Sequence, residues 1–339
     1  VVLVPQTDVD GEFLADLPPV GHVEAELVLA TGHLLELHAL AVAGDLERDN
    51  LGLSLADREV LRHASVVFHL GAHFAWGLSV EQSRAVNVEG AKRVALLAAE
   101  QKSRLVMIGG YMLKNHEHLQ RIGIDPRNPE LTNWPAVYRQ VGGYEASKLE
   151  AHFATLEVMS AKGGEITVVH PATVCGHSRT GHIVDGQPLV ELIRNLVQGK
   201  LTAVPGTAKH WLPLVTVDYL VELVAVCAFD PAMVGQELLA LDDQTPNLRE
   251  LLVQVAQPLG LKSPKHYISL RLLKLLLSIP PVARILNTKP EALDFIQTTR
   301  FDTASVEQFA NRYGIAKPDI RESLQHTATF VNSYCITKG

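Results

Sequence analysis

Short apolar runs alternate, along the first half of the chain, with segments in which apolar residues recur at helical spacing. The apolar runs fall at residues 1–4, 38–43, 65–70, 104–108 and 165–170, and helical periodicity occupies residues 56–63, 87–100 and 144–161. Strands that are apolar throughout and separated by helices are typical of a parallel sheet buried on both faces. The pattern therefore predicts an α/β fold with a doubly wound parallel sheet.

The rhythm changes after Gly176, where helical patterns at 189–196, 217–228 and 248–259 dominate. We expect a main domain over residues 1–180. A smaller, mainly helical region over 181–339 should lie on the substrate side, with 205–245 partly returning to the main domain. Residues 126–141 contain three prolines and two asparagines and are expected to form a long ordered loop.

The longest apolar stretch, residues 270–286, is interrupted by three basic residues and two prolines. These interruptions make it too broken to span a bilayer. Its leucines are spaced as on a helix, which favours a lid or core helix at the substrate cleft. A helix that lies on a membrane surface or lines a lipid pocket is the alternative.

Composition excludes several function classes. A net charge of −7, with no basic block, makes nucleic acid an unexpected partner. Cys175, Cys227 and Cys335 are scattered and odd in number, which favours a reducing, cytoplasmic compartment. The fifteen histidines form no paired-ligand motif, so no metal is expected. Residues 1–5 lack the basic lead and cleavage site of a signal peptide.

Tyr144 and Lys148 are the central candidates for chemistry. Residues four apart share one face of a helix, so the ammonium can approach the phenol. A nearby positive charge lowers the pKa of a phenol, and such a phenol can exchange a proton while a hydride moves to or from carbon. The spacing alone is also compatible with a surface helix, so the surrounding sequence must decide.

That surrounding sequence resembles the extended short-chain dehydrogenases/reductases, which belong to the NAD-dependent epimerase/dehydratase superfamily. Beside the Tyr–Lys pair, five segments match the family pattern: Gly44-Asp45-Leu46, His69-Leu70-Gly71-Ala72, Asn87-Val88-Glu89-Gly90, His170-Pro171-Ala172-Thr173-Val174-Cys175-Gly176 and Pro213-Leu214-Val215-Thr216-Val217-Asp218. The resemblance implies a Rossmann-type fold and an NAD(P)-dependent enzyme. Gly44-Asp45-Leu46 followed by Leu51-Gly52-Leu53-Ser54 is most similar to the thioester and fatty acyl reductase branch, which implies NADP rather than NAD and an apolar or acyl substrate.

The same resemblance assigns roles to residues. Tyr144 and Lys148 would be catalytic, and Lys148 would also hold the nicotinamide ribose. The cofactor would further contact Asp45 and Leu46 at the adenine, Gly71, Ala72 and Asn87 along its length, and Pro171, Ala172, Thr173 and Val174 at the nicotinamide. Family members often dimerise through the helix that carries the Tyr–Lys pair, which implies a possible homodimer.

Two features depart from the family. No Gly-rich turn for the pyrophosphate is found, and Val1–Val4 is similar to the family's second strand, so the first βα unit is expected to be missing. The usual substrate-binding Ser or Thr is replaced by Gly109 and Gly110. Tyr111, Thr173 or a backbone N–H beside the glycines could hold the substrate oxygen instead.

Three functions stay open from the sequence. The leading one is an oxidoreductase that reduces a carbonyl or acyl thioester, or oxidises the alcohol, of an apolar substrate. A sugar-nucleotide epimerase or dehydratase, or a hydroxysteroid-type dehydrogenase, would use the same Tyr–Lys pair. A non-catalytic nucleotide-binding sensor on the same scaffold would explain both departures.

Overall fold

The computed structural model describes the backbone of residues 2–5, 22–28 and 34–40, and then residues 42–75, 77–286 and 288–337, with side chains from residue 42 to 333.

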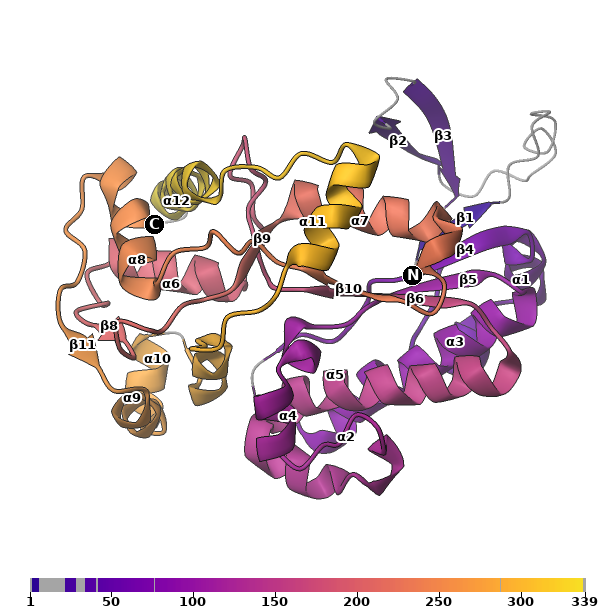
Figure 1. The fold of residues 1–339 in the computed structure, drawn as a ribbon, viewed down its shortest axis with the longest axis horizontal. Coiled ribbons are helices and arrows are strands. Elements are labelled where there is room, and N and C mark those ends of the chain that lie inside the picture. The colour runs from indigo at the N-terminus through magenta and orange to yellow at the C-terminus, as the bar shows by residue number, and fades with distance from the viewer. Residues whose placement is uncertain are drawn as a thin grey trace.

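A five-stranded sheet forms the centre of the main domain (Figure 1). Its order is β1 (Val2–Pro5), β4 (Ala64–His69), β5 (Arg104–Ile108), β6 (Ile166–Pro171) and β10 (Glu237–Ala240). The four strands from β4 to β10 run parallel. The continuous apolar runs predict β4, β5 and β6, whereas they predict no strand at β10. The expected α/β parallel sheet is thereby confirmed.

The first forty residues differ from the prediction. β1 pairs with β4 in the antiparallel sense, so it is an edge strand and not the parallel second strand of the fold. The strand expected at 38–43 lies earlier, as β3 (Leu34–Leu40), and pairs with β2 (His22–Val28) in a separate antiparallel hairpin. Antiparallel strands need only a local connection, whereas a parallel pair needs a crossover helix. The apolar runs alone did not distinguish these two arrangements.

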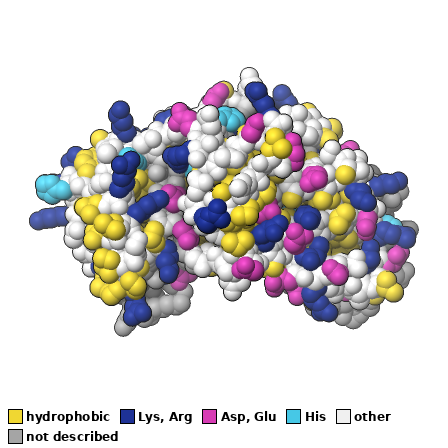
Figure 2. Space-filling model, turned by 90° about the horizontal axis from the view of Figure 1, so that it is seen from below, with side chains coloured by type: hydrophobic (Ala, Val, Ile, Leu, Met, Phe, Trp, Pro, Cys, Tyr) yellow, Lys and Arg dark blue, Asp and Glu magenta, His cyan; other side chains and the backbone are white. Residues whose placement is uncertain are grey.

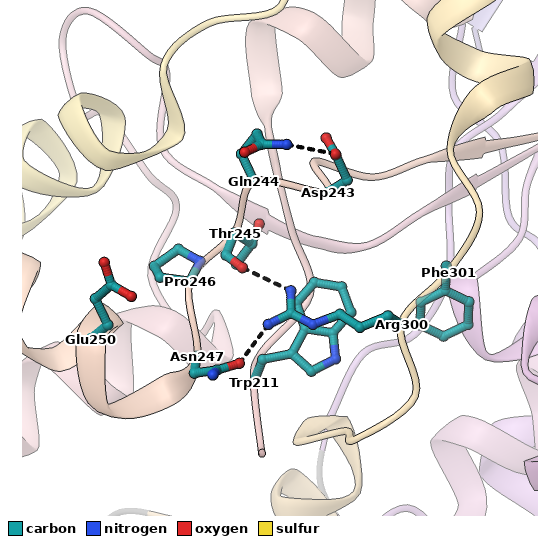
Figure 3. A pocket seen from close by; sticks show the side chains of 9 residues that line it. All are labelled: Trp211, Asp243, Gln244, Thr245, Pro246, Asn247, Glu250, Arg300 and Phe301. Carbon is teal, nitrogen blue, oxygen red and sulfur yellow. Dashed lines mark hydrogen bonds between the residues drawn. The ribbon is translucent and has the colours of Figure 1, made fainter. Parts of the chain in front are cut away.

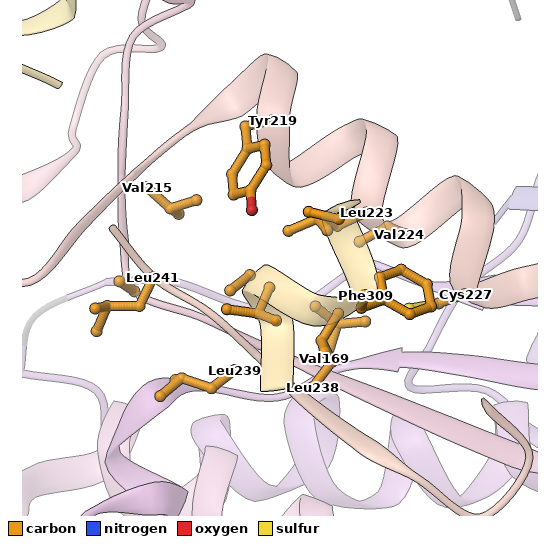
Figure 4. Packing of buried hydrophobic residues seen from close by; sticks show 14 of the residues in the cluster. Val169, Val215, Tyr219, Leu223, Val224, Cys227, Leu238, Leu239, Leu241 and Phe309 are labelled. Atoms are coloured by element: carbon orange, nitrogen blue, oxygen red, sulfur yellow. The ribbon is translucent and has the colours of Figure 1, made fainter. Parts of the chain in front are cut away.

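Helices cover both faces of the main sheet (Figure 1). One layer contains α3 (Gly90–Gln101) and α5 (Trp134–Lys162), which pack against each other, and α3 also packs on β4 and β5. The other contains α7 (Val217–Phe229) on β5 and β6, and α11 (Ala304–Tyr313) on β10. Figure 4 shows the Phe309 ring of α11 beside Cys227 of α7, in the core that covers this face of the sheet. The sheet is therefore buried on both faces, as its apolar strands require.

Several short elements connect these layers. They are η1 (Asp49–Gly52), α1 (Leu55–Leu61), α2 (Val80–Ser83), η2 (Arg84–Glu89), η3 (Tyr111–Lys114), α4 (His116–Arg121), η4 (Pro129–Leu131) and η5 (Pro231–Met233). The loop expected at 126–141 is partly helical, because α5 begins at Trp134 and bends at Gly142, where φ is 80°. Pro135 stands in the first turn of α5, where a proline lacks no hydrogen bond that a helix needs. The expected loop was therefore wrong from residue 134 onward.

The second region lies beyond the carboxyl ends of the strands (Figure 1). β6 continues into β7 (Thr173–Cys175), which pairs with β9 (Leu214–Thr216). A second core joins α6 (Pro188–Val197), α8 (Leu248–Ala256) and α12 (Ile320–Thr337). Smaller elements complete it: β8 (Val204–Pro205), η6 (Gln257–Leu259), β11 (Tyr267–Ile268), α9 (Leu270–Leu277), α10 (Pro280–Ile285) and η7 (Pro290–Phe295). Within the described ranges, no helix combines the length and apolarity needed to cross a membrane.

Candidate active site

The loop that carries Asp45 and Leu46 is held against the start of α3. A Cβ atom at Gly90 would lie 2.9 Å from the Leu46 Cβ and 3.2 Å from its carbonyl oxygen, so a residue without a side chain is required there. Arg93 donates to the Leu46 carbonyl at 2.9 Å. Asp45 itself is exposed, and its carboxylate accepts the Glu47 N–H at 2.9 Å. Gly90 thus explains why the Asn-x-x-Gly opening and Gly44-Asp45-Leu46 occur together.

Asn87 lies at the centre of a second set of contacts. It is buried, its side-chain oxygen accepts the His73 N–H at 2.6 Å, and its amide donates to the His73 carbonyl and to the Ser147 hydroxyl at 2.9 Å. Ser147 in turn donates to the Tyr144 carbonyl at 2.9 Å. The predicted cofactor residue therefore fixes the turn after β4, which begins with Gly71 and Ala72, to the helix that carries Tyr144. Both the oxygen and the amide group of the Asn87 side chain are thus hydrogen-bonded within the protein.

Tyr144 and Lys148 lie on one side of α5, near the carboxyl end of β5. The Tyr144 ring meets the Phe74 ring edge-on, with 4.6 Å between centroids. Lys148 donates to the Ile108 carbonyl at 2.7 Å, and both side chains are partly buried. The structure thus brings the pair to the strand end where α/β folds bind ligands.

The protonation behaviour of the pair differs from the prediction. Burial raises the pKa of Tyr144 to about 12, and the Glu145 carboxylate adds to the shift. Burial lowers the pKa of Lys148 to about 8. Lys148 does not lower the pKa of the phenol here, because its ammonium is directed to the Ile108 carbonyl. The expected low pKa of Tyr144 was wrong for this structure.

Gly109 and Gly110 occupy two very different environments. A Cβ at Gly109 would lie 2.4 Å from His170 Nδ1, so the imidazole fills the space that a side chain would take. At Gly110 nothing lies within 4 Å of a Cβ, and the backbone is extended at φ −169°. Their backbone N–H groups are engaged, because Gly109 donates to the Val169 carbonyl at 2.8 Å and Gly110 is directed at His170 Nδ1 at 3.4 Å. The backbone N–H groups of the two glycines themselves are therefore not free donors for a substrate oxygen.

Tyr111 does not replace the missing hydroxyl. Its side chain is 2% exposed, and its hydroxyl donates to the Phe295 carbonyl at 3.0 Å. The ring packs edge-on against Phe295 and Phe301 in the core. A tyrosine that follows a strand end can point either into the core or into the cleft, and the sequence does not separate the two. The structure corrects the expectation that Tyr111 binds substrate.

The turn over residues 171–174 supplies a more suitable hydroxyl. Its backbone is fixed, since Ala172 donates to the Ala240 carbonyl at 2.9 Å and Thr173 donates to the Pro213 carbonyl at 3.0 Å. The Thr173 hydroxyl is buried, yet it has no partner among the described atoms. Buried polar groups in native proteins are almost always hydrogen-bonded, so an orphan is a candidate for contact with a ligand. Pro171 and Val174 flank it on β6 and β7.

A polar network of two buried histidines and two half-buried charged residues lies beneath Gly109, and it was not predicted. His170 Nε2 lies 3.0 Å and His152 Nε2 lies 3.4 Å from the Glu237 carboxylate, which also pairs with the Lys114 ammonium. Burial lowers the pKa of both imidazoles, that of His152 to about 3, so they are neutral. The four residues come from η3, α5, β6 and β10, and no short motif connects them.

Three members of this network could in principle hold a metal ion. The ligating atoms of His152, His170 and Glu237 lie within 4.8 Å of one another. However, the Lys114 ammonium already neutralises the carboxylate, and the Gly110 N–H is directed at His170 Nδ1. With a proton on Nε2, each imidazole directs an N–H at the Glu237 carboxylate. A metal ion would need the same nitrogen to be unprotonated. Among the described residues, the Nδ1 atom of His152 is the one ring nitrogen of this network that is left without a partner. A pocket of about 430 Å³ reaches it from the surface along Lys114, His152 and Glu237.

A second pocket, also of about 430 Å³, lies in the second region (Figure 3). Its Arg300 guanidinium stacks on the Trp211 ring at 3.9 Å and donates to the Thr245 carbonyl and to Asn247. Asp243 points away from Arg300 in this view and pairs with Lys317. Because these charges are satisfied within the protein, the pocket offers no free charged group. None of the predicted site residues lines it.

A nicotinamide dinucleotide has an adenine side, a pyrophosphate and a nicotinamide side. The residues described here fit the adenine side and the nicotinamide side. Asp45 on the exposed loop can meet the adenine side, and Lys148 with the orphan Thr173 hydroxyl can meet the nicotinamide side. A Gly-rich turn for the pyrophosphate does not occur in residues 42–75, 77–286 or 288–337.

Comparison with known proteins identifies one family and two proteins with similar sequences. The model of a family described as male sterility protein, an NAD-binding family, matches residues 30–224. The non-canonical nonribosomal peptide synthetase FrzA of Cladobotryum sp. is 27% identical over 212 residues, and cpsA of Aspergillus campestris is 26% identical over 204. Each match covers 58% of this chain and 19% of the relative, so the chain spans about a fifth of the length of these proteins.

Solved structures share the fold. The terminal R domain of the myxalamid PKS-NRPS pathway superposes with a TM-score of 0.66 at 20% identity, covering 88% of this chain and 76% of that one. The PhqB reductase domain of Penicillium fellutanum has a TM-score of 0.54 at 16% identity, covering 86% and 74%. At these identities the likeness concerns the fold.

Proposed function

The chain belongs to the male sterility protein family of NAD(P)-dependent oxidoreductases, within the extended short-chain dehydrogenases/reductases, and from this premise we propose that it reduces an apolar acyl thioester to the aldehyde. NADPH is the proposed cofactor, and Tyr144 with Lys148 the proposed catalytic pair. The observation that carries the proposal is the position of this pair beside the carboxyl end of β5, on the helix that Asn87 ties to the turn after β4.

The proposed role of Tyr144 follows from its environment. The bound cofactor would supply the hydride that reaches the thioester carbonyl carbon. A pKa of about 12 keeps the phenol protonated at neutral pH, so Tyr144 can donate its proton to the carbonyl oxygen as the carbon is reduced. The resulting hemithioacetal returns that proton to Tyr144 when its C–S bond breaks, and the aldehyde and a thiolate leave. The thiolate takes its proton from water.

Lys148 would orient this step and not exchange the proton itself. With a pKa of about 8, its amine is mostly protonated at neutral pH. An ammonium anchored on the Ile108 carbonyl can hold ribose hydroxyls and stabilise the transient phenolate. The Thr173 hydroxyl would contact the carboxamide or the substrate oxygen, which would give this buried group the partner it lacks.

The test is a reductase assay on the longest natural form of the protein that contains these residues. NADPH oxidation is followed with a medium-chain acyl thioester, and the aldehyde is trapped and identified. The Tyr144→Phe variant should bind NADPH as the parent does, because the hydroxyl is not a proposed cofactor anchor, but should lose turnover by roughly a hundredfold or more.

Three outcomes would contradict the proposal. Cofactor binding without reduction of thioesters, aldehydes or ketones would favour a nucleotide-binding sensor. Full turnover by Tyr144→Phe would remove the proposed acid. Activity on a ketone or an alcohol alone would keep the oxidoreductase and reject the thioester.

A further inference from the structure

The segment from Leu261 to Lys289 has an unusual composition for this chain. It contains six Lys or Arg residues and no Asp or Glu, although the whole chain has a net charge of −7. The surface of this segment is therefore positive on an otherwise acidic protein. Such a local excess of one charge points to a partner of the opposite charge.

The two short helices of this segment also expose aliphatic side chains. Leu272 and Leu275 on α9 are 50% and 65% exposed, Ile279 in the connection is 47% exposed, and Ile285 on α10 is 59% exposed. Only Leu277 of these helices is buried. Figure 2 views the molecule from below, and at its left end hydrophobic side chains gather, with Lys and Arg around them and few acidic side chains. We call the four exposed residues the aliphatic ridge.

The ridge lies at an outer corner of the molecule but is connected to the candidate active site. α9 and α10 form the lower left corner in Figure 1. Lys274 of α9 pairs with Asp294 of η7 at 2.5 Å, and Glu291 of η7 accepts the Gly77 N–H at 3.0 Å. Gly77 follows the segment that contains Phe74, the ring neighbour of Tyr144. The ridge is thus linked through η7 to the segment that contacts Tyr144.

We propose that the ridge and its flanking basic residues are a docking surface for an anionic lipid bilayer. Aliphatic side chains on a short amphipathic helix insert into the interface, while the surrounding Lys and Arg bind the lipid phosphates. A convex corner suits a soft bilayer, whereas a folded protein partner would need a matching hollow. The proposal concerns peripheral binding, and it does not depend on the proposed reductase chemistry.

Vesicle sedimentation tests this surface directly. The protein is mixed with vesicles of phosphatidylcholine alone, or of phosphatidylcholine and phosphatidylglycerol in equal parts. We expect binding to the anionic vesicles only, weakened by high salt. The double variant Arg271→Glu/Arg284→Glu should weaken it by roughly tenfold or more, because each basic residue is attracted to the anionic surface and each introduced Glu is repelled by it. Leu272→Ser/Leu275→Ser should weaken it comparably and reduce what remains at high salt.

Matched variants separate the site from general effects. Arg127→Glu/Arg139→Glu makes the same change in net charge at exposed positions elsewhere, and Leu55→Ser/Leu131→Ser removes two other exposed leucines. Both controls should bind vesicles as the parent does. All variants change exposed side chains, and circular dichroism melts verify their folding.

Three outcomes would overturn the proposal. One is equal binding to neutral and anionic vesicles, and another is equal loss in the control variants. The third is absence of vesicle binding together with ridge-dependent binding of a small acidic helical protein, which would assign the surface to a protein partner. None of these results depends on turnover, so failure here is distinguishable from failure of the proposed function.

Discussion

His170 and Gly109 show how one residue choice fixes another. The imidazole stands where a side chain at 109 would be, so the usual Ser could not be introduced there without displacing the network of His170 and Glu237. At Gly110, one residue later, the space is open. Packing against His170 therefore explains why residue 109 carries no substrate-binding hydroxyl. Packing does not explain the glycine at residue 110.

This difference predicts opposite results for two similar variants. Gly109→Ser should lower the free energy of unfolding by roughly 1–3 kcal/mol, the usual cost of overpacking a buried position. Gly110→Ser should change it by less than about 0.5 kcal/mol. Urea denaturation measures both. If the proposed function is right, Gly110→Ser should also raise kcat, because it places a hydroxyl at the end of β5. Equal destabilisation by the two variants would contradict the structure.

The orphan hydroxyl of Thr173 predicts a variant that separates stability from binding. Thr173→Val keeps the shape and removes a buried group with no partner, so stability should stay constant or rise by up to about 1 kcal/mol. Thr167→Val is the matched control, because the Thr167 hydroxyl donates to the Met233 carbonyl at 2.7 Å, and its loss should cost about 1–2 kcal/mol. Fluorescence titration should show weaker NADPH binding for Thr173→Val only. A large loss of stability in Thr173→Val would mean that the hydroxyl has a structural partner.

At the scale of elements, an ion pair joins η2 to α5. Arg84 contacts the buried Glu150 carboxylate through two nitrogens, at 2.7 and 3.0 Å, and the Tyr138 hydroxyl donates to the same carboxylate at 2.8 Å. Removing the guanidinium leaves a buried negative charge with one neutral donor. Arg84→Met should therefore lower the free energy of unfolding by roughly 1–3 kcal/mol, below the value for a fully buried pair because Arg84 is partly exposed.

The comparison for this prediction is Arg58→Met. Arg58 pairs with Glu100 on the exposed side of the first helices, where the expected loss is below about 0.5 kcal/mol. Thermal melts of both variants decide the matter. A loss for Arg84→Met no larger than that for Arg58→Met would show that the pair does not anchor α5.

At the scale of the whole molecule, Lys148 couples folding to pH. Its pKa falls from 10.5 to about 8 on folding, because burial disfavours the ammonium. Between these values the unfolded chain binds more protons than the folded one, so the free energy of unfolding rises with pH from about 8 to 10. The full shift corresponds to at most roughly 3 kcal/mol. Lys148→Met should abolish this rise.

The measurement is the difference between the parent and Lys148→Met in urea denaturation across that pH window. Subtraction cancels the opposite effect of Tyr144, whose pKa of about 12 in the folded state makes stability fall only when the unfolded phenol ionises, above about pH 10. A difference that does not change with pH would show that Lys148 is solvated in the folded protein.

The sequence by itself determined the alternation of strands and helices, the strands β4, β5 and β6 of the parallel sheet, and the four-residue spacing that sets Tyr144 and Lys148 on one side of α5. These features depend on the local period of the backbone, which is 2 in a strand and 3.6 in a helix, and the side chains report it directly. The family segments added Gly90 and Asp45, although only the structure showed that Leu46 is the reason for the glycine.

Only the tertiary structure decided which way β1 runs, where the Tyr111 hydroxyl points, and that Lys148 binds the Ile108 carbonyl and leaves the pKa of Tyr144 high. It also assembled His152, His170, Glu237 and Lys114, which come from four elements. Such contacts join residues far apart in the chain, and they are fixed by packing and by the need to satisfy buried polar groups. The local period of a helix or strand does not contain that information, because a segment can form the same helix or strand whether a given side chain faces the core or the cleft.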